Sequence, residues 1–293
     1  MKRRSGWTLL SVLVFILAAA AFVYAAYNLV SIGWEYYRGD QEYSQLGNMF
    51  TGKPDPETSV GEDETQNPAD ESDMTAGRIT ETYEVGYIED ADPPMRVDWE
   101  GLKASNPDIA GWVYMDAFPG NSYPVMQAED NDFYLHRDFN KGYLYAGCIF
   151  MDFENAKDFS DPASIVYGHN MKNGSMFACL KKLKDQKTYD ENPYFWILTP
   201  RGDYRYHIYS VFETTPVSDV YTLWRNDGKN FLKWEEGLRS ASLVKEDVML
   251  TEHDHTVILT TCTPDHDHRT VVIGRCCSRK QPPRKTVRPD ETR

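Results

Sequence analysis

The sequence is poor in cysteine, has fewer positive than negative charges, and contains only one long apolar run. Five cysteines in 293 residues are too few for a disulfide scaffold, so the fold must depend on a hydrophobic core. The net charge of −14 argues against a nucleic-acid-binding protein. This length allows one mid-sized domain with appendages.

The long apolar run lies near the N-terminus. Residues 5–34 contain no charged side chain, and residues 9–30 are almost wholly apolar, which is long enough to span a bilayer as a helix. Because residues 2–4 are basic, we predict a cytoplasmic N-terminus over residues 1–6, a single-pass transmembrane signal-anchor over residues 7–34, and an extracellular remainder. A cleaved signal peptide is the alternative, but the run exceeds the usual apolar region of such a peptide.

Most of the excess negative charge follows this run. Residues 55–100 hold 15 Asp or Glu and only two basic residues. Residues 35–78 are also rich in Gly, Pro, Ser and Thr and have few apolar side chains, so they bury too little surface to order themselves. We predict an acidic disordered stalk over residues 35–78, extended by its own charge, which holds the domain away from the membrane.

From residue 79 onward, short strand-like segments alternate with a few helical ones. The predicted strands are residues 111–115, 123–126, 146–151, 163–167, 194–198, 204–214, 256–261 and 270–273. The predicted helical segments lie within residues 97–110, 131–135, 175–183 and 229–243. Many short strands with few helices indicate a mainly β fold, a closed barrel with helical insertions. Residues 278–293 carry six basic residues and three prolines, and we predict a basic disordered tail there.

The last two predicted strands flank a short polar loop. The first strand leads to Cys262, and the second follows Arg269. If these strands are neighbours, the thiol and the guanidinium face one another across the loop. A nearby cation favours the reactive thiolate, and an arginine can hold a developing oxyanion. Such a site also needs a proton carrier, usually histidine, and His169 follows a predicted strand.

Each of these residues also has a purely structural interpretation. From the local sequence alone, Cys262 is more typical of a buried cysteine that ends a core strand than of a nucleophile. His169 could simply bond a neighbouring backbone group. Arg275 competes with Arg269, but it lies six residues further along the strand, about 20 Å away at the rise of a β-strand.

Other histidines and cysteines are weaker candidates. Residues 265–268 resemble a metal-binding tract, but four adjacent loop residues rarely supply a closed zinc site, so we expect no metal. The remaining histidines have no setting comparable to that of His169: His136, His207, His253 and His255. Cys148 and Cys179 lie in apolar segments and are expected in the core. A disulfide between two of the other four cysteines is possible, but the sequence does not show one: Cys148, Cys179, Cys276 and Cys277.

Several segments together resemble the sortases, which are membrane-anchored cysteine transpeptidases of Gram-positive surfaces. The three active-site segments of that family resemble LTTC ending at Cys262, RTVVIG beginning at Arg269, and YGHNM around His169. Further segments resemble class B sortases in particular: Asp98-Trp99, Asn106-Pro107-Asp108, Asp130-Asn131-Asp132, Phe150-Met151-Asp152 and Gly174-Ser175-Met176-Phe177. The resemblance covers residues 96–277, and its strength lies in several motifs that occur in the right order.

This resemblance implies a closed eight-stranded sortase-type β-barrel over residues 79–277, preceded by N-terminal helices. It implies Cys262 as nucleophile, His169 as general acid and base, and Arg269 as stabiliser of the oxyanion and substrate. The residues expected to line the substrate groove are Asn131, Tyr167, Thr260 and Tyr221. Class B enzymes often have Ser where this chain has Thr260, and an acidic residue is frequent at the position of Thr263. No metal or organic cofactor is required.

The implied activity is cleavage of an NPxTG-like or NPQTN-like sorting motif after Thr on secreted proteins. A thioester on Cys262 would then pass the acyl group to an amine of cell-wall peptide. A pilin-polymerising class B enzyme, which uses a lysine amine, remains an alternative. A wall-associated cysteine peptidase is a second one, although its Cys usually precedes its His, whereas His169 precedes Cys262 here. A non-enzymatic surface barrel is a third.

Overall fold

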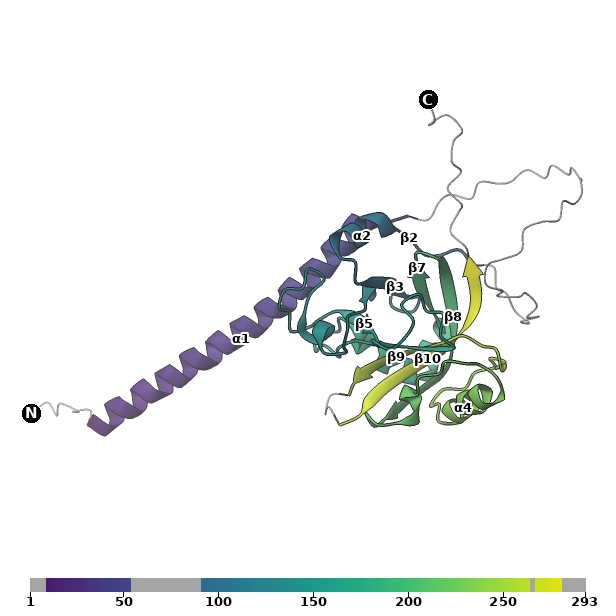
Figure 1. Ribbon diagram of the computed structural model, residues 1–293. Coiled ribbons are helices and arrows are strands. Elements are labelled where there is room, and N and C mark those ends of the chain that lie inside the picture. Colours follow the sequence, from purple (N-terminus) through teal and green to yellow (C-terminus); the bar gives the residue numbers. More distant parts are fainter. Residues whose placement is uncertain (1–8, 54–90, 264–266, 281–293) are drawn as a thin grey trace, which may run out of the picture.

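The computed structural model describes residues 9–53, 91–263 and 267–280, which form a β-barrel with a long helix leading into it (Figure 1). The barrel strands are β3 (Ile109–Met115), β4 (Ser122–Met126), β5 (Ile149–Met151), β6 (Ala163–Tyr167), β7 (Tyr194–Thr199), β8 (Gly202–Thr214), β9 (Thr256–Cys262) and β10 (Arg269–Lys280). They close in the order β10-β8-β7-β3-β4-β5-β6-β9. The predicted closed eight-stranded barrel is confirmed.

The helical elements lie between the strands or at the N-terminus. They are α1 (Leu9–Phe50), α2 (Trp99–Ser105), the 3-10 helix η1 (Phe133–His136), the 3-10 helix η2 (Phe177–Lys184), α3 (Gln186–Glu191), the 3-10 helix η3 (Asp219–Tyr221) and α4 (Lys229–Ser240). The four predicted helical segments overlap α2, η1, η2 and α4, whereas the short helices α3 and η3 were not predicted. Asp98 starts α2 by accepting a hydrogen bond from the Gly101 amide.

The barrel has apolar side chains on both of its faces, and the alternation along β9 explains why. Val257 and Leu259 point into the barrel core, whereas Ile258 packs with Phe231 and Leu238 of α4 on the outside. Because side chains alternate along a strand, Thr260 and Cys262 continue the outer row of Ile258. The connection that contains η3 and α4 therefore covers the face on which Cys262 lies.

Helix α1 does not end where the predicted stalk begins. It continues to Phe50, so the prediction of disorder from residue 35 is wrong for residues 35–50. The side chains of residues 11–34 are mostly exposed and apolar, and within the described part of the chain α1 is long and apolar enough to cross a membrane. Residues 1–8 and 54–78 lie outside the described residues.

A short strand pair corrects the role predicted for the stalk. β1 (Thr51–Gly52) pairs with β2 (Arg96–Val97), and the Asp98 amide donates to the Phe50 carbonyl at 2.8 Å. The acidic segment between these strands therefore leaves and rejoins the domain at one place. It cannot set the distance between α1 and the barrel, because α1 itself contacts the barrel.

The C-terminal boundary also differs from the prediction. β10 runs to Lys280, with Arg279 paired to Tyr204 and Lys280 paired to Asp203 of β8. The predicted tail from residue 278 is therefore wrong for its first three residues, and residues 281–293 lie outside the described ones. The basic composition misled the prediction, since the long partner strand β8 offers backbone partners to this segment whatever its side chains.

A buried carboxyl joins α4 to the barrel. Glu235 is fully buried and accepts a hydrogen bond from the Thr256 hydroxyl at the start of β9. Next to it, Arg275 and Asp254 form a buried ion pair with a nitrogen–oxygen distance of 2.9 Å. Burial, the largest cause, raises the pKa of Glu235 to about 8 from 4.5.

This pKa predicts how stability depends on pH. A carboxyl whose pKa rises on folding binds its proton more tightly in the folded state. Its stabilising contribution is thus complete below pH 4.5 and falls as the pH approaches 8, by at most about 1.4 kcal/mol per pH unit. Glu235→Gln should flatten this fall, measured as Tm between pH 5 and 8. Glu236→Gln, at an exposed position on the same helix, should leave the slope unchanged, and an equal slope in both variants would contradict the account.

Candidate active site

Strand pairing brings Cys262 and Arg269 together. β9 and β10 are antiparallel, and their register places Arg269 directly opposite Cys262. The Thr263 amide donates to the His268 carbonyl at 3.0 Å, so that pair is hydrogen-bonded and the Cys262–Arg269 pair next to it is not. In a non-hydrogen-bonded antiparallel pair the two side chains lie on the same face and closest together.

Thr263 closes the loop between these two strands. Its hydroxyl donates to the His268 carbonyl at 3.0 Å and accepts from the His268 amide at 3.1 Å. With the Thr263 amide and hydroxyl already donating to this carbonyl, Arg269 Nη1 adds a third hydrogen bond to it at 2.9 Å. The position at which class B relatives often carry an acidic residue is therefore used here to join the two ends of the loop.

His169 reaches the same rim of the barrel from the other neighbour of β9. β6 runs parallel to β9 with Tyr167 opposite Thr260, and the Gly168 amide donates to the Thr260 carbonyl at 3.1 Å. A Cβ at Gly168 would lie 2.4 Å from the Ile149 side chain and 2.8 Å from the Phe177 ring, so a larger residue would have to displace both. Asn170 then donates its amide to the Cys262 carbonyl at 2.9 Å. His169 therefore lies in a segment that is tied to β9 on both sides.

A backbone carbonyl orients the His169 ring. Nε2 lies 2.8 Å from the Leu135 carbonyl, which can only accept, so Nε2 carries a proton and Nδ1 is the nitrogen that can gain or lose one. The His136 ring stacks against His169 with centroids 5.2 Å apart, and Tyr145 stacks at 6.1 Å. The prediction that His136 has no comparable setting is wrong, because η1 turns it toward His169.

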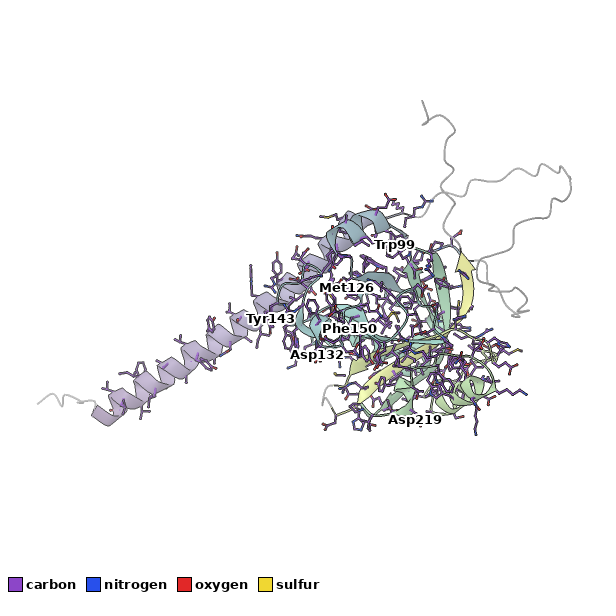
Figure 2. All side chains as sticks on the ribbon, viewed as in Figure 1. Trp99, Met126, Asp132, Tyr143, Phe150 and Asp219 are labelled. Atoms are coloured by element: carbon purple, nitrogen blue, oxygen red, sulfur yellow. The ribbon has the colours of Figure 1, made fainter. Side chains whose placement is uncertain are left out.

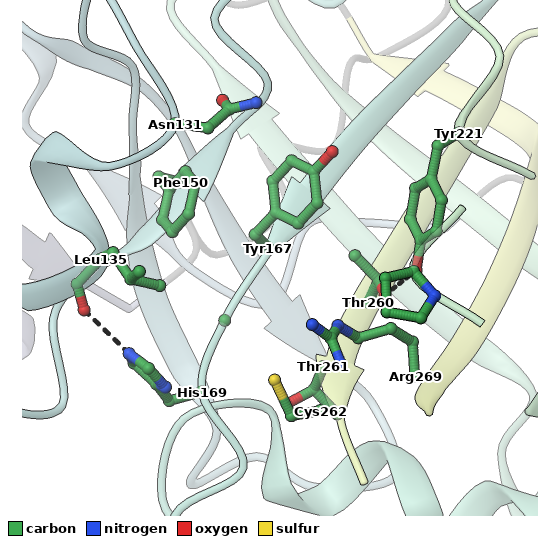
Figure 3. A pocket seen from close by; sticks show the side chains of 12 residues that line it. Asn131, Leu135, Phe150, Tyr167, His169, Tyr221, Thr260, Thr261, Cys262 and Arg269 are labelled. Atoms are coloured by element: carbon green, nitrogen blue, oxygen red, sulfur yellow. Dashed lines mark hydrogen bonds between the residues drawn. The ribbon is translucent and has the colours of Figure 1, made fainter. Parts of the chain in front are cut away.

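All seven predicted site residues line one cavity of about 330 Å³. The full lining is Asn131, Leu135, Phe150, Tyr167, Gly168, His169, Pro216, Tyr221, Thr260, Thr261, Cys262 and Arg269. Figure 3 shows the Cys262 thiol between the His169 ring and the Arg269 guanidinium, with Tyr167 and Tyr221 further along the groove. Sequence reasoning therefore selected residues from five separate segments that meet at one place.

One wall of this groove is held by α4. The Tyr221 hydroxyl and the Thr260 hydroxyl are 3.0 Å apart, and the rings of Tyr221 and Tyr167 stack at 6.4 Å. Trp234 on α4 donates its indole N–H to the Asp219 carbonyl of η3 at 2.9 Å, which fixes the turn that carries Tyr221. Burial raises the pKa of Tyr221, so its hydroxyl remains protonated and available as a donor.

Sequence reasoning assigned no role to Asp152, which holds the opposite wall. Its Oδ2 accepts from the Asn131 amide at 2.8 Å and from the Tyr167 hydroxyl at 2.9 Å, while Oδ1 accepts from the Glu154 amide at 3.0 Å. The side chain is only 7% exposed. Burial, and then the Asp152 carboxylate, raise the pKa of Tyr167 well above its usual range. The sequence signal was an acidic residue directly after a short apolar strand.

The other arginine, the other cysteines and the described residues of the possible metal tract are not part of this site. Arg275 lies in the middle of β10, bonds Asp254 and does not line the cavity. All five cysteines are free thiols, and Cys148 and Cys179 are buried as expected. Residues 265 and 266 of the possible metal tract lie outside the described residues. Within the described ranges no group of three His, Cys, Asp or Glu could hold a metal ion.

Comparisons with known proteins show which family this chain resembles. Residues 114–276 match the sortase domain family. The chain is 32% identical to sortase B of Listeria monocytogenes over 186 residues, covering 62% of this chain and 74% of that protein. A crystal structure of sortase B from Bacillus anthracis is similar with a TM-score of 0.61 and 26% identity, over 83% of this chain and 98% of that one.

A second similar structure is described as a complex with substrate. The Staphylococcus aureus sortase B–substrate complex has a TM-score of 0.56 and 27% identity, and the match covers 60% of this chain and 83% of that one. A closed barrel with a cysteine, a histidine and an arginine at one rim is the arrangement expected of an enzyme built around a thiol. The chain belongs to the sortase family, in its class B, and is thus a cysteine transpeptidase.

The Asp152 contacts lead to a prediction about peptide binding. Asp152→Asn keeps the shape but removes the charge and one acceptor oxygen, so Asn131 and Tyr167 lose a shared partner. We expect the KM for a sorting peptide to rise about tenfold, the worth of one charge-assisted hydrogen bond. The kcat should stay within about twofold, because the variant does not touch Cys262 or Arg269.

Asp132→Asn is the matched control for this measurement. Asp132 is exposed, lies next to Asn131, and makes no capping hydrogen bond with its side chain. Steady-state kinetics on both variants should change KM for Asp152→Asn alone. An unchanged KM for Asp152→Asn, or a loss confined to kcat, would show that Asp152 does not organise the peptide groove.

Proposed function

We propose that this sortase transfers an acyl group through a thioester on Cys262, with Arg269 and His169 as its catalytic partners. The observation that supports this most strongly is the register of β9 with its two neighbours. It sets Arg269 opposite Cys262 on one side, and on the other side it ties the His169 segment to the same rim. The three groups also line one cavity large enough for an extended peptide segment.

In the first half of the reaction, the Cys262 thiolate attacks the carbonyl carbon of a threonine in the sorting motif. The carbonyl oxygen gains negative charge, which the Arg269 guanidinium stabilises with its N–H donors. His169 gives the proton on Nδ1 to the departing amine as the C–N bond breaks. The products are a thioester on Cys262, the released C-terminal fragment, and a neutral His169.

The second half reverses these roles with a different amine. The incoming amine attacks the thioester carbonyl, and His169 Nδ1 takes its proton. Arg269 again stabilises the oxyanion, and the C–S bond breaks to restore the Cys262 thiolate. The bond from Nε2 to the Leu135 carbonyl holds the same tautomer through both halves, so the ring needs no flip between them.

The substrate is a secreted protein with an NPxTG-like or NPQTN-like motif. The groove beyond Cys262 is lined by the aromatic rings of Phe150, Tyr167 and Tyr221 and by the Asn131 amide, which suits an extended segment of mixed polarity. One relative of known structure is described as a sortase B–substrate complex, which supports a peptide in this groove. The acceptor is an amine of cell-wall peptide, and a pilin lysine is the alternative.

We also propose that residues 7–34 anchor the enzyme in the cell membrane, with residues 1–6 in the cytoplasm and the barrel outside. The exposed apolar side chains of α1 in this range and the basic residues 2–4 support that orientation. A secreted substrate and a wall acceptor are both reached from that side. The basic segment 281–293 and the acidic segment 54–90 are proposed to be appendages of the catalytic domain.

The intact mass of the full chain in detergent tests the thioester. We expect incubation with NPxTG-type and NPQTN-type peptides to add the N-terminal peptide fragment, in a form that hydroxylamine removes, and Cys262→Ala to show no adduct. The peptide that gives the adduct identifies the motif class.

Adding a wall-peptide amine should convert the adduct into a new amide product, whereas a peptidase would release the free acid at an unchanged rate. A hydroxylamine-stable adduct, or an adduct that persists in Cys262→Ala, would rule out the proposed intermediate.

A further inference from the structure

The half of α1 that follows the apolar segment packs against the catalytic domain through a single stripe. Gly39, Tyr43, Leu46 and Phe50 are buried, at intervals of four, three and four residues, which is one face of a helix. Gly39, Tyr43 and Phe50 contact the segment between η1 and β5. In Figure 1 this part of α1 runs alongside that segment, and in Figure 2 Tyr143 of the same segment lies beside the helix.

A short chain of contacts leads from this helix to the His169 ring. The Tyr43 hydroxyl donates to the Gly147 carbonyl and lies 3.5 Å from the Cys148 sulfur. Gly147 has a φ of 54°, and a Cβ there would lie 2.3 Å from the Leu135 carbonyl oxygen. That oxygen is the acceptor of His169 Nε2. The Gly147 backbone that Tyr43 holds therefore lies next to the Leu135 carbonyl oxygen, which orients the His169 imidazole.

Further contacts of α1 reach the two segments that flank the histidine. Asn173, four residues after His169, donates its amide to both carboxylate oxygens of Asp40 at 3.1 Å. Arg38 donates to the Tyr143 carbonyl, and Glu42 accepts from the Phe139 amide at 3.2 Å. The His169 segment and the segment that contains Leu135 are thus both attached to the same two turns of helix.

We propose that residues 38–50 of α1 are a positioning element of the active site, with Tyr43 as the residue that places the Leu135 carbonyl against His169. This rests on the proposed role of His169 as general acid. The anchor and the catalytic domain then form one continuous body. Tyr36 already packs against the core of the domain, about 3 Å along the helix from Trp34, so the active site works at a fixed height close to the membrane.

The test distinguishes a misplaced His169, the proposed general acid, from a general loss of enzyme activity. The full chain in lipid nanodiscs is given the same acyl peptide either as an amide substrate or as an aryl ester. The amide nitrogen must be protonated as it leaves, whereas a phenolate can leave without a proton. A misplaced His169 should therefore slow acylation by the amide and spare the ester. Rates are expressed per reactive Cys262 thiol, which removes any inactive fraction.

For Tyr43→Phe we expect the kcat on the amide to fall about tenfold, with the ester rate within about twofold and the KM unchanged. The ring contact with Tyr123, at 5.3 Å between centroids, is retained in this variant. Asp40→Ala, at an exposed position, should lower the amide-to-ester ratio in the same direction and by less. Tyr37→Phe makes the same change at a position that is 56% exposed, and it should leave the ratio unaltered.

A failure of this inference can be distinguished from a failure of the proposed function. If the unmodified chain acylates with both substrates, and Tyr43→Phe and Asp40→Ala keep its amide-to-ester ratio, then α1 does not position His169 and the inference is wrong. If the unmodified chain forms no acyl-enzyme with either substrate, the proposed function fails, and the inference fails with it. A parallel loss on both substrates in Tyr43→Phe would assign Tyr43 to stability alone and would also overturn the inference.

Discussion

Strand β9 lies between β6 and β10, and the position of the active site depends on its pairing with both. β6 is parallel to β9, so the two strands end at the same rim, and β10 is antiparallel, so it begins there. Three chain segments consequently meet at one edge of the barrel. Backbone hydrogen bonds determine the register on each side. A slip of one residue on either side would turn the paired side chains to the opposite face.

Around this rim, the side chains of the proposed site are held by groups to which the proposed reaction assigns no step. The Leu135 carbonyl orients His169, Asp152 ties Asn131 to Tyr167, and α4 supports the turn that carries Tyr221. Each support comes from a connection between strands and not from the barrel itself. The same barrel can thus keep its acyl-transfer chemistry while the connections change the substrate groove.

The strands and the central chemical pair were predictable from the sequence, because both depend on local patterns. Alternating and β-branched segments marked all eight strands, and the short loop after Cys262 implied that Arg269 would lie opposite it. The assignment of His169 depended on the resemblance, because the sequence around it does not indicate that β6 pairs with β9. Asp152 and the His136 stacking were missed because they depend on contacts between connections that are distant in sequence. The helix beyond residue 34 was missed because its buried stripe falls among exposed polar residues.

The most direct test of the account is whether residues 262 and 269 are true cross-strand partners. A non-hydrogen-bonded antiparallel pair has its Cα atoms about 4.5 Å apart, which is close enough for a disulfide. Peptide mapping of the Arg269→Cys chain after mild oxidation should therefore find a bond between Cys262 and the new cysteine. Thr270→Cys, whose partner is Thr261, should leave Cys262 as a free thiol. A reduced Cys262 in Arg269→Cys, or a bridge in Thr270→Cys, would contradict the register on which the site is built.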